Sequence, residues 1–371
     1  MDQEQFVVSA RKYRPASFDT VVGQLSITST LRSAIVNKQL AQAYLFCGPR
    51  GVGKTTCARI FAKTINCMNL QPNAEPCNEC ESCKAFNSGR SLNIHELDAA
   101  SNNGVDEIRD LVEQVRILPQ IGKYSVYIID EVHMLSSAAF NAFLKTLEEP
   151  PAHAVFILAT TEKHKIIPTI LSRCQIYDFN RMKVGDTVEH LKYIAQKEGV
   201  AAEEEALNVI AQKADGAMRD ALSIFDQIVS FSGKEVTYDK VIKNLNVLDY
   251  DYYFRLTDFF NKGQVAESLL LFNEILEKGF DAYNLVTGLG KHFRNLLVAK
   301  DKATVQLLEV SASIKERYLR QAGECDVNFL YEALKISEQC EVQYKMRMEK
   351  RLCVEIAFIK LSQINELKKK V

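Results

Sequence analysis

The segment that most constrains the fold is a glycine-rich stretch, GPRGVGKT, at residues 48–55. It follows a run with strand character at residues 43–47 and opens a helix-like run at residues 54–65. The spacing fits G-x-x-x-x-G-K-[ST], in which glycines let backbone N–H groups surround phosphate oxygens at a helix N-terminus. A plain glycine turn is the alternative, but the full match in this context favours a nucleotide phosphate site.

Each part of this loop has an expected role in binding a nucleoside triphosphate. Lys54 can reach the β- and γ-phosphates, and the Thr55 hydroxyl can ligate Mg²⁺. We therefore expect ATP and Mg²⁺ as cofactors. The residues expected to hold the nucleotide are Gly48, Pro49, Arg50, Gly51, Val52, Gly53, Lys54, Thr55 and Thr56.

A second candidate feature is the apolar run at residues 126–129, which ends in Asp130 and Glu131. At a strand end, Asp130 can hold Mg²⁺ through water, and Glu131 can polarise an attacking water as a general base. Acids at a strand end face solvent by default, but the phosphate loop upstream favours catalytic roles here. Because water needs its own base, the pair favours a hydrolase over a phosphotransferase. His133 lacks companions at metal-ligand spacing, so we expect it to be structural.

The first half of the chain alternates between strand-like and helix-like runs. Such alternation predicts an α/β fold with a parallel sheet that helices cover on both faces. We expect strands at residues 43–47, 93–97, 125–130, 155–159 and 175–179, and helices at 54–65, 105–115, 138–147 and 168–171. After about residue 180 the strand signals stop, and we expect helices at 186–198, 202–215 and 218–231, then a helical remainder.

Four of the ten cysteines form a C-x9-C-x2-C-x2-C cluster, namely Cys67, Cys77, Cys80 and Cys83. Four thiolates at this spacing can close a tetrahedral site on Zn²⁺ and leave no open position for catalysis. Unrelated free cysteines and an iron–sulfur cluster remain alternatives. The other six cysteines lie in runs that resemble structural elements, so we expect them to be small buried residues.

Composition excludes several classes of protein. The net charge is -1, so any contact with nucleic acid must use a local patch or be shared with partners. No apolar run approaches the roughly 18 residues of a membrane-spanning helix. Residues 1–10 carry Asp2 and Glu4 and lack the features of a secretory signal. A cytoplasmic protein follows, in which the cysteines do not form a disulfide framework.

Several motifs together resemble the AAA+ ATPases and, within them, the DNA polymerase III gamma/tau family, over essentially the whole chain. RKYRP at residues 11–15, with Val22 and Gly23, resembles the family's adenine-binding motif, and DEVH at 130–133 resembles its Walker B motif. Thr160 matches the sensor-1 position. SRC at 172–174 and GAMRDALS at 216–223 resemble the clamp-loader arginine motif and the sensor-2 helix.

The resemblance implies a domain organisation and residue roles. It implies a Rossmann-like AAA+ core at about 1–179 with a zinc-binding insertion at about 67–83, a helical lid at 180–243, and an all-α collar for oligomerisation at 244–371. Zinc would be structural, on the four clustered cysteines. The nucleotide would contact Arg11, Tyr13, Pro15, Val22, Thr160 and Arg219, and Arg173 would act in trans on a neighbour's nucleotide.

The function implied is that of an ATPase motor subunit of a clamp loader, part of the DNA polymerase III complex without being the polymerase itself. The expected partners are delta-type and delta-prime-type subunits, other gamma/tau copies, the sliding clamp, primer–template DNA and the polymerase III core, in a nucleoid-associated replisome. Arg109, at the start of a helix, is our candidate DNA contact. Two rival functions are a non-hydrolysing clamp-loader subunit and a different AAA+ motor such as a branch-migration helicase.

Overall fold

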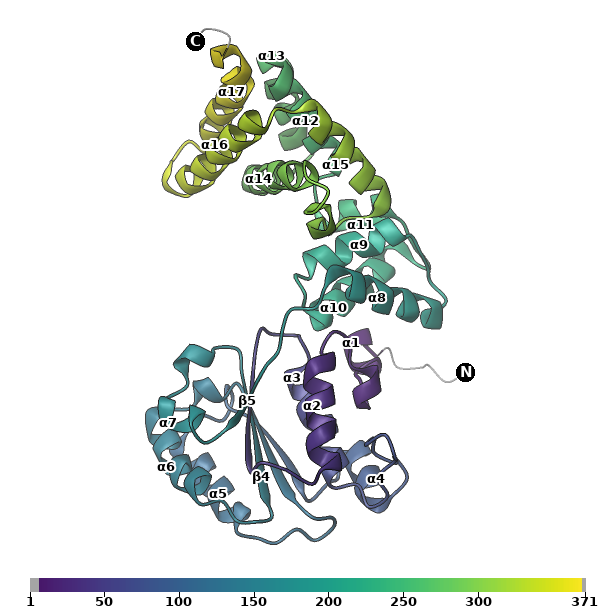
Figure 1. The fold of residues 1–371 in the computed structure, drawn as a ribbon, viewed down its shortest axis with the longest axis vertical. Helices are drawn as coiled ribbons and strands as arrows, with labels where there is room; N and C mark the ends of the chain where they lie inside the picture. Colours follow the sequence, from purple (N-terminus) through teal and green to yellow (C-terminus); the bar gives the residue numbers. More distant parts are fainter. Residues whose placement is uncertain (1–6, 369–371) are drawn as a thin grey trace. The chain divides into compact units, whose positions relative to one another are not determined.

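The computed structural model describes residues 7–368, so Asp2 and Glu4 lie outside the described residues. It contains two compact units, which we describe separately (Figure 1). Unit 1 takes in the chain up to Lys197 together with Ala211–Gln227, and unit 2 takes in Glu198–Ile210 and the chain from Ile228 onward. Within the described part of the chain, no helix is both long enough and apolar enough to cross a membrane.

Unit 1 is built on a five-stranded parallel sheet in the order β2-β3-β4-β1-β5. Its strands are β1 (Ala43–Cys47), β2 (Ile94–Asp98), β3 (Ser125–Asp130), β4 (Ala154–Thr160) and β5 (Gln175–Asp178). All residues of β1 and β4 are buried, as expected for central strands covered on both faces. The expected α/β fold is confirmed.

Two hydrophobic clusters occupy the two faces of this sheet. One face packs on α2 (Leu25–Val36) and α3 (Lys54–Ile65), and the other on α5 (Val105–Val115) and α6 (Ser137–Glu148). Figure 1 shows these two pairs of helices on opposite sides of the strands. Successive strand residues alternate between the clusters, because side chains of a strand point to opposite faces in turn.

The shorter elements of unit 1 connect this frame. They are α1 (Ser9–Lys12), η1 (Phe18–Thr20), α4 (Glu81–Asn87), η2 (Val132–Met134), η3 (Lys163–Lys165) and α7 (Pro168–Leu171). The helices α1, α2 and α4 were not expected from the sequence. The pattern of α2 is weakened by five Ser and Thr residues among its twelve, although Ile27, Leu31 and Ile35 do form a buried stripe.

Three helices follow the sheet, namely α8 (Val184–Glu198), α9 (Glu204–Lys213) and α10 (Met218–Ser232). Their positions agree closely with the three helices expected there. The expectation that strands end near residue 180 was wrong, because β6 (Ala201–Ala202) and β7 (Glu235–Val236) form a small parallel ladder in unit 2. Strands of two residues are too short to produce a periodic hydrophobic pattern.

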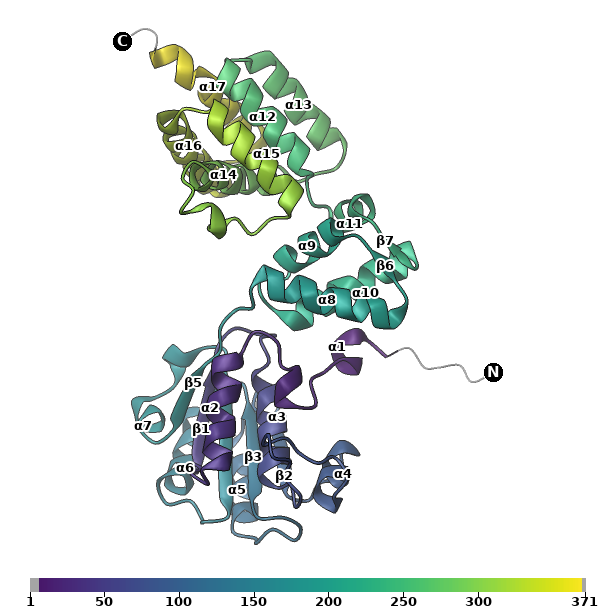
Figure 2. The ribbon, with the colours of Figure 1, turned by 45° about the vertical axis from the view of Figure 1, so that its right-hand side comes forward.

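The rest of unit 2 is helical, as Figure 2 shows. Its further elements are α11 (Tyr238–Leu245), α12 (Tyr250–Lys262), α13 (Val265–Glu277), α14 (Ala282–Ala299), η4 (Val305–Leu307), α15 (Ala312–Glu324), α16 (Val327–Met346) and α17 (Lys350–Lys368). The helices from α12 onward enclose one hydrophobic cluster that includes Phe260, Phe293 and Phe358, which are fully buried. Of the six cysteines expected to be buried, five are buried and Cys174 is partly exposed.

Candidate functional site

The phosphate loop joins β1 to α3 in a conformation that requires glycine. Gly48 has φ +147°, and a Cβ there would lie 2.4 Å from the Phe179 carbonyl oxygen. Gly51 has φ +77°, and a Cβ there would lie 3.0 Å from the Cβ of Ala217, at the start of the Arg219 helix. Gly53 precedes α3 in the left-handed region, so the loop ends at a helix N-terminus. This is the backbone shape that a phosphate group needs.

Side chains from α3 and β3 meet beside this loop. The Thr55 hydroxyl donates a 2.6 Å hydrogen bond to a carboxylate oxygen of Asp130. The Lys54 ammonium donates to the carbonyl oxygens of Gly48 and Pro49, at 2.8 Å each. Burial lowers the pKa of Lys54, while the charges of Glu131 and Asp130 oppose that shift. A buried cation and a hydroxyl–carboxylate pair therefore face one space.

Glu131 stands in a conformation that is unusual for a residue with a side chain. Its φ of 47° and ψ of 44° are left-handed, which costs on the order of 1 kcal/mol and tends to occur at functional sites. Its carboxylate accepts from the Thr161 hydroxyl at 2.9 Å and the Thr161 amide at 3.2 Å. The His133 Nδ1 lies 3.5 Å from the same carboxylate and 3.0 Å from the Thr160 hydroxyl. These contacts fix the direction of the Glu131 side chain.

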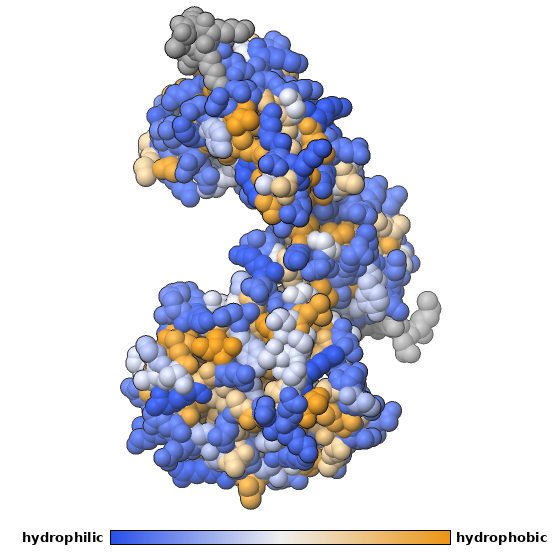
Figure 3. Space-filling view, in the orientation of Figure 1, coloured by the Kyte–Doolittle hydropathy of each residue, from blue (hydrophilic) through white to orange (hydrophobic). Residues whose placement is uncertain are grey.

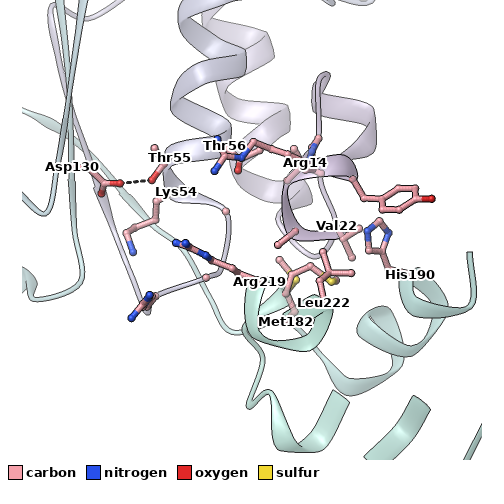
Figure 4. Close-up of a pocket in the computed structure, with 18 of the residues that line it drawn as sticks. Arg14, Val22, Lys54, Thr55, Thr56, Asp130, Met182, His190, Arg219 and Leu222 are labelled. Carbon is pink, nitrogen blue, oxygen red and sulfur yellow. Dashed lines mark hydrogen bonds between the residues drawn. The ribbon is translucent and has the colours of Figure 1, made fainter. Parts of the chain in front are cut away.

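A cavity of about 420 Å³ connects these groups to a second, more apolar region within unit 1. Figure 4 shows Lys54, Thr55 and Asp130 at one end and Val22, Met182, His190 and Leu222 at the other, with Arg219 between them. Residues expected to bind nucleotide that line this cavity are Tyr13, Pro15, Val22, Arg50, Gly51, Gly53, Lys54, Thr55, Thr56 and Arg219. Asp130 and Glu131 line it as well.

Other expected residues do not line the cavity. Arg11, Gly48, Pro49 and Thr160 are absent from its wall, and Val52 is buried beneath the loop with 1% exposure. Thr160 is nevertheless close, because its carbonyl oxygen accepts from the Gly48 amide at 3.2 Å.

The cavity also contains residues that we did not expect from the sequence. They are Ala10, Arg14, Val21, Asp98, Ala100, Met182, His190, Met218 and Leu222. Arg14 lies inside the RKYRP motif, which gave a local signal. Met182 lies just before α8 and His190 lies on it, and neither belongs to a motif. Burial lowers the pKa of His190. Only the folding of α8 and α10 against the loop brings these residues to the site.

Cationic side chains gather around the cavity. The pKa of Arg14 is lowered by burial first and then by the charge of Arg59, with Arg219 and Arg11 contributing. The charge of Glu96 opposes this shift, and an anion placed among these arginines would be stabilised by them. Together with Lys54, this group suits a polyphosphate chain.

Arg173 and Arg109 lie away from this cavity. The Arg173 guanidinium pairs with Glu148 of α6 at 2.7 Å and donates to the Thr169 carbonyl oxygen at 2.7 Å. Its side chain is 33% exposed, so another molecule can reach it. Arg109 is exposed on α5 and pairs with Asp106 at 3.2 Å.

The four clustered cysteines come together just beyond the C-terminal end of α3. Their Sγ atoms all lie within 4.8 Å of one another. Four sulfurs at the usual Zn–S distance of about 2.3 Å would be roughly 3.8 Å apart in a tetrahedron, so the thiols fit the ion. The amides of Cys80 and Glu79 hold the pKa of Cys77 at about 6, which favours its thiolate, the form that binds metal. The geometry is compatible with zinc.

Two family models match the chain. A model described as "DNA polymerase III, delta subunit" matches residues 23–183. A second, described as "DNA polymerase III clamp loader subunit, ATPase lid domain", matches residues 186–234. The matched residues include the phosphate loop, the acidic pair and Arg219.

Curated relatives match nearly the whole chain. The chain is 42% identical over 353 residues to the DNA polymerase III subunit tau of Bacillus subtilis, covering 95% of this chain and 62% of that protein. It is 36% identical to the subunit tau of Escherichia coli, covering 96% and 55%. It is 32% identical over 362 residues to the subunit gamma of Buchnera aphidicola, covering 96% and 97%. The chain thus spans about three fifths of the tau subunits and nearly all of the gamma subunit.

Proposed function

Since the chain belongs to the DNA polymerase III gamma/tau family, we propose that it is an ATP-hydrolysing motor subunit of a clamp loader. Such a subunit would use ATP binding and hydrolysis to open a sliding clamp and load it onto primed DNA during replication. The observation that carries this proposal is the convergence of Lys54, Thr55, Asp130 and Glu131 on one cavity that continues into an apolar region.

The two ends of the cavity match the two parts of ATP. Val22, Met182 and Leu222 offer an apolar wall for the adenine, while Arg14, Lys54 and Arg219 offer positive charge for the phosphates. When ATP enters, Lys54 exchanges its bonds to two loop carbonyls for bonds to phosphate oxygens. Because this ammonium is already buried, the phosphates would meet a cation that has lost most of its water.

Glu131 would act as the general base. Its carboxylate is held by Thr161, and we propose that it accepts a proton from the water that attacks the γ-phosphate. Thr160, one residue before Thr161, would sense the γ-phosphate or that water. A fixed base needs little reorganisation at the moment of reaction.

Thr55 and Asp130 would hold Mg²⁺, because a hydroxyl and a carboxylate are hard oxygen donors and already lie 2.6 Å apart. When bound, Mg²⁺ would neutralise charge on the phosphate oxygens. The four-cysteine cluster would hold structural Zn²⁺, which would fasten residues 67–83 to the end of α3.

Communication with neighbours would use two arginines. Arg219 lies on α10, and its backbone amide is 3.5 Å from the Gly51 carbonyl oxygen of the phosphate loop. Nucleotide bound by that loop would therefore bias the position of the helix. Arg173 is outside its own chain's cavity and would stabilise the transition state on a neighbour's nucleotide. Nucleotide-dependent loading then follows as a shift between states that bind ATP unequally.

The partners that we propose are delta-type and delta-prime-type subunits, further gamma/tau copies, the sliding clamp, primer–template DNA and the polymerase III core, in the cytoplasmic, nucleoid-associated replisome. On α16, Val327, Tyr331, Val342 and Met346 are each at least 41% exposed, and their spacing puts them on one side of the helix. Figure 3 shows hydrophobic residues at the surface of both units on the face that it draws. Such residues support assembly with other subunits.

Steady-state ATP hydrolysis tests the proposal. The purified chain would be assayed alone and then with sliding clamp, primed DNA and partner subunits. Strong stimulation only in the complete mixture supports a clamp-loader motor. ATP hydrolysis that ignores clamp and DNA would move the function toward another AAA+ motor, and absence of hydrolysis in every mixture would indicate a non-hydrolysing subunit.

A further inference from the structure

The cysteine module, residues 67–83, contacts the segment that forms one wall of the nucleotide cavity. That wall segment, residues 10–22, supplies Ala10, Tyr13, Arg14, Pro15, Val21 and Val22 to the cavity. Near the end of this segment lies the short helix η1, which the cysteine module contacts through Glu75, two residues before Cys77.

Glu75 binds the start of η1. One carboxylate oxygen accepts from the Phe18 amide at 3.1 Å, and the other accepts from the Asp19 amide at 3.0 Å. The first N–H groups of a helix have no partner within that helix, so a carboxylate placed here can accept from two of them. Glu75 therefore caps a helix that is 56 to 57 residues away in the sequence.

The same carboxylate is buried and paired. Glu75 is 7% exposed, and Arg32 of α2 forms a salt bridge to it. The Arg32 guanidinium also lies 5.7 Å from the centre of the Phe18 ring, which is 2% exposed. The Arg32 side chain is 26% exposed and also pairs with Asp19 of η1, so its guanidinium joins Glu75 to that helix.

The cysteine module fixes Glu75 in turn. Its carbonyl oxygen accepts from the Gln71 amide at 3.0 Å, and its own amide donates to the Asn73 side chain at 3.3 Å. Lys63 of α3, which is 3% exposed, donates to the side chains of Asn78, between Cys77 and Cys80, and of Asn87, at the end of α4. The loop that carries Glu75 thus connects Cys67 to Cys77, two of the four clustered cysteines.

We propose that Glu75 is a positioning residue through which the cysteine module holds the adenine wall of the nucleotide cavity in place. The inference rests on the proposed function, because it assigns this cavity to ATP. Metal bound by the four thiols would order the module, the module would place Glu75, and Glu75 would hold η1. Val21 and Val22, directly after η1, would then be ready for the base.

The test is nucleotide binding by Glu75→Gln in the full chain. The amide keeps the size of the side chain but has no charge to pair with Arg32. Its NH2 group would also face a backbone N–H of η1, which is a donor and cannot accept. We expect the Kd for a fluorescent ATP analogue to rise roughly three- to tenfold. Glu79→Gln is the matched control, since Glu79 is exposed in the same module. An unchanged Kd in Glu75→Gln would overturn the proposal.

Two further readouts separate a positioning role from general damage. Inorganic triphosphate lacks the base and would sense the wall segment only through Arg14, so its affinity should fall less than that of ATP in Glu75→Gln. An equal loss for triphosphate and ATP would argue against the proposal. Zinc content, measured by mass spectrometry, should equal that of the unmodified protein. If Glu75→Gln does not fold, Arg32→Lys is the second variant. We expect it to lose less ATP affinity than Glu75→Gln would. An unchanged ATP affinity in Arg32→Lys would contradict the proposal.

Removal of the metal from both the unmodified chain and Glu75→Gln tests whether the metal and Glu75 act through the same contact. Chelation should weaken ATP binding in the unmodified chain and add little in Glu75→Gln, because both changes release the same contact. Equal effects of chelation in the two proteins would show that the module does not act through Glu75. Failure of the unmodified, metal-loaded chain to bind either ATP or triphosphate would refute the proposed function itself.

Discussion

The Thr55 hydroxyl donates a 2.6 Å hydrogen bond to Asp130, although the two residues are 75 positions apart in the chain. Thr55 lies in the first turn of α3, and Asp130 ends β3, which is separated from β1 by β4 in the sheet. The parallel strands end at one edge of the sheet, and this edge brings the phosphate loop and the acidic pair together.

Removing the Thr55 hydroxyl tests this pair. In Thr55→Val the side chain keeps its shape but loses an oxygen donor, so we expect ATP hydrolysis to fall by at least about 100-fold and the Mg²⁺ requirement to rise. Hydrolysis measured across a Mg²⁺ titration would show both effects. Thr30→Val, on the exposed side of α2, is the control. Normal hydrolysis in Thr55→Val would contradict the assignment.

Glu131 should separate binding from chemistry. Glu131→Gln keeps an oxygen that can accept from Thr161 but cannot take a proton, so we expect a loss of about 100- to 10,000-fold in hydrolysis. The Kd for ATP should change by less than about twofold. Single-turnover hydrolysis and equilibrium binding would be measured together. If binding and hydrolysis fell equally, Glu131 would be a structural residue rather than the base.

Cys80 should be needed for zinc and for local structure. Its sulfur accepts from the Cys83 amide at the start of α4, so Cys80→Ser would remove one thiolate ligand while a hydroxyl could still cap the helix. We expect bound zinc to fall from about one ion per chain to a small fraction, as four thiolates form a closed structural site. Metal analysis and proteolysis within residues 67–83 would be the measurements. Cys174→Ser, outside the cluster, should retain the metal.

Buried His292 should make unit 2 sensitive to acid. Burial lowers its pKa from 6.5 to about 3, which outweighs the opposing effect of the Gln321 hydrogen bond. Its Nδ1 lies 3.0 Å from the Tyr318 hydroxyl, and its Nε2 lies 3.1 Å from Oε1 of Gln321. The Gln321 amide nitrogen donates elsewhere, so Nε2 carries the proton and Nδ1 accepts from Tyr318.

The direction of the pH effect follows from these two pKa values. Between pH 6.5 and 3 the unfolded imidazole binds a proton that the folded one does not, so the free energy of unfolding decreases as pH falls. At pH 5 the loss relative to neutral pH would be roughly 2 kcal/mol. In His292→Gln this loss of about 2 kcal/mol in the free energy of unfolding should disappear. Urea unfolding at pH 7 and pH 5 would measure it. The exposed His164→Gln should behave like the unmodified protein.

The sequence predicted those parts of the site that depend on a short motif or a strand end. The phosphate loop and the acidic pair are of this kind, because neighbouring residues make the shape that the chemistry needs. His190 and Met182 had no such signal, and within the GAMRDALS motif only Arg219, not Leu222, was expected at the nucleotide. His190 and Leu222 belong to helices whose hydrophobic pattern serves packing as well, and Met182 precedes α8, so only tertiary folding brings all three to the cavity. Glu75 was missed for the same reason, since the partners of its carboxylate are 43 or more residues away.

Arg173 should matter for hydrolysis only when subunits are assembled. Its guanidinium is held by Glu148 outside its own cavity, so Arg173→Ala in the isolated chain should bind ATP with a Kd within about twofold of the unmodified value. In the complete assembly, hydrolysis stimulated by clamp and primed DNA should fall by about 1,000-fold or more, as for other arginines supplied in trans. Lys163→Ala, which removes an exposed ion pair with Asp178, is the control.

A mixing experiment decides whether Arg173 acts between subunits. Lys54→Ala chains cannot engage the phosphates but still carry Arg173, whereas Arg173→Ala chains keep a complete cavity. Assemblies that contain both variants would recover part of the stimulated hydrolysis only if one chain's arginine completes another chain's site. No recovery, with both variants present in the same assemblies, would mean that Arg173 works within its own chain or only maintains its ion pair with Glu148. Glu148→Gln, which frees the guanidinium, should then separate these two cases by lowering stimulation only if the ion pair itself is required.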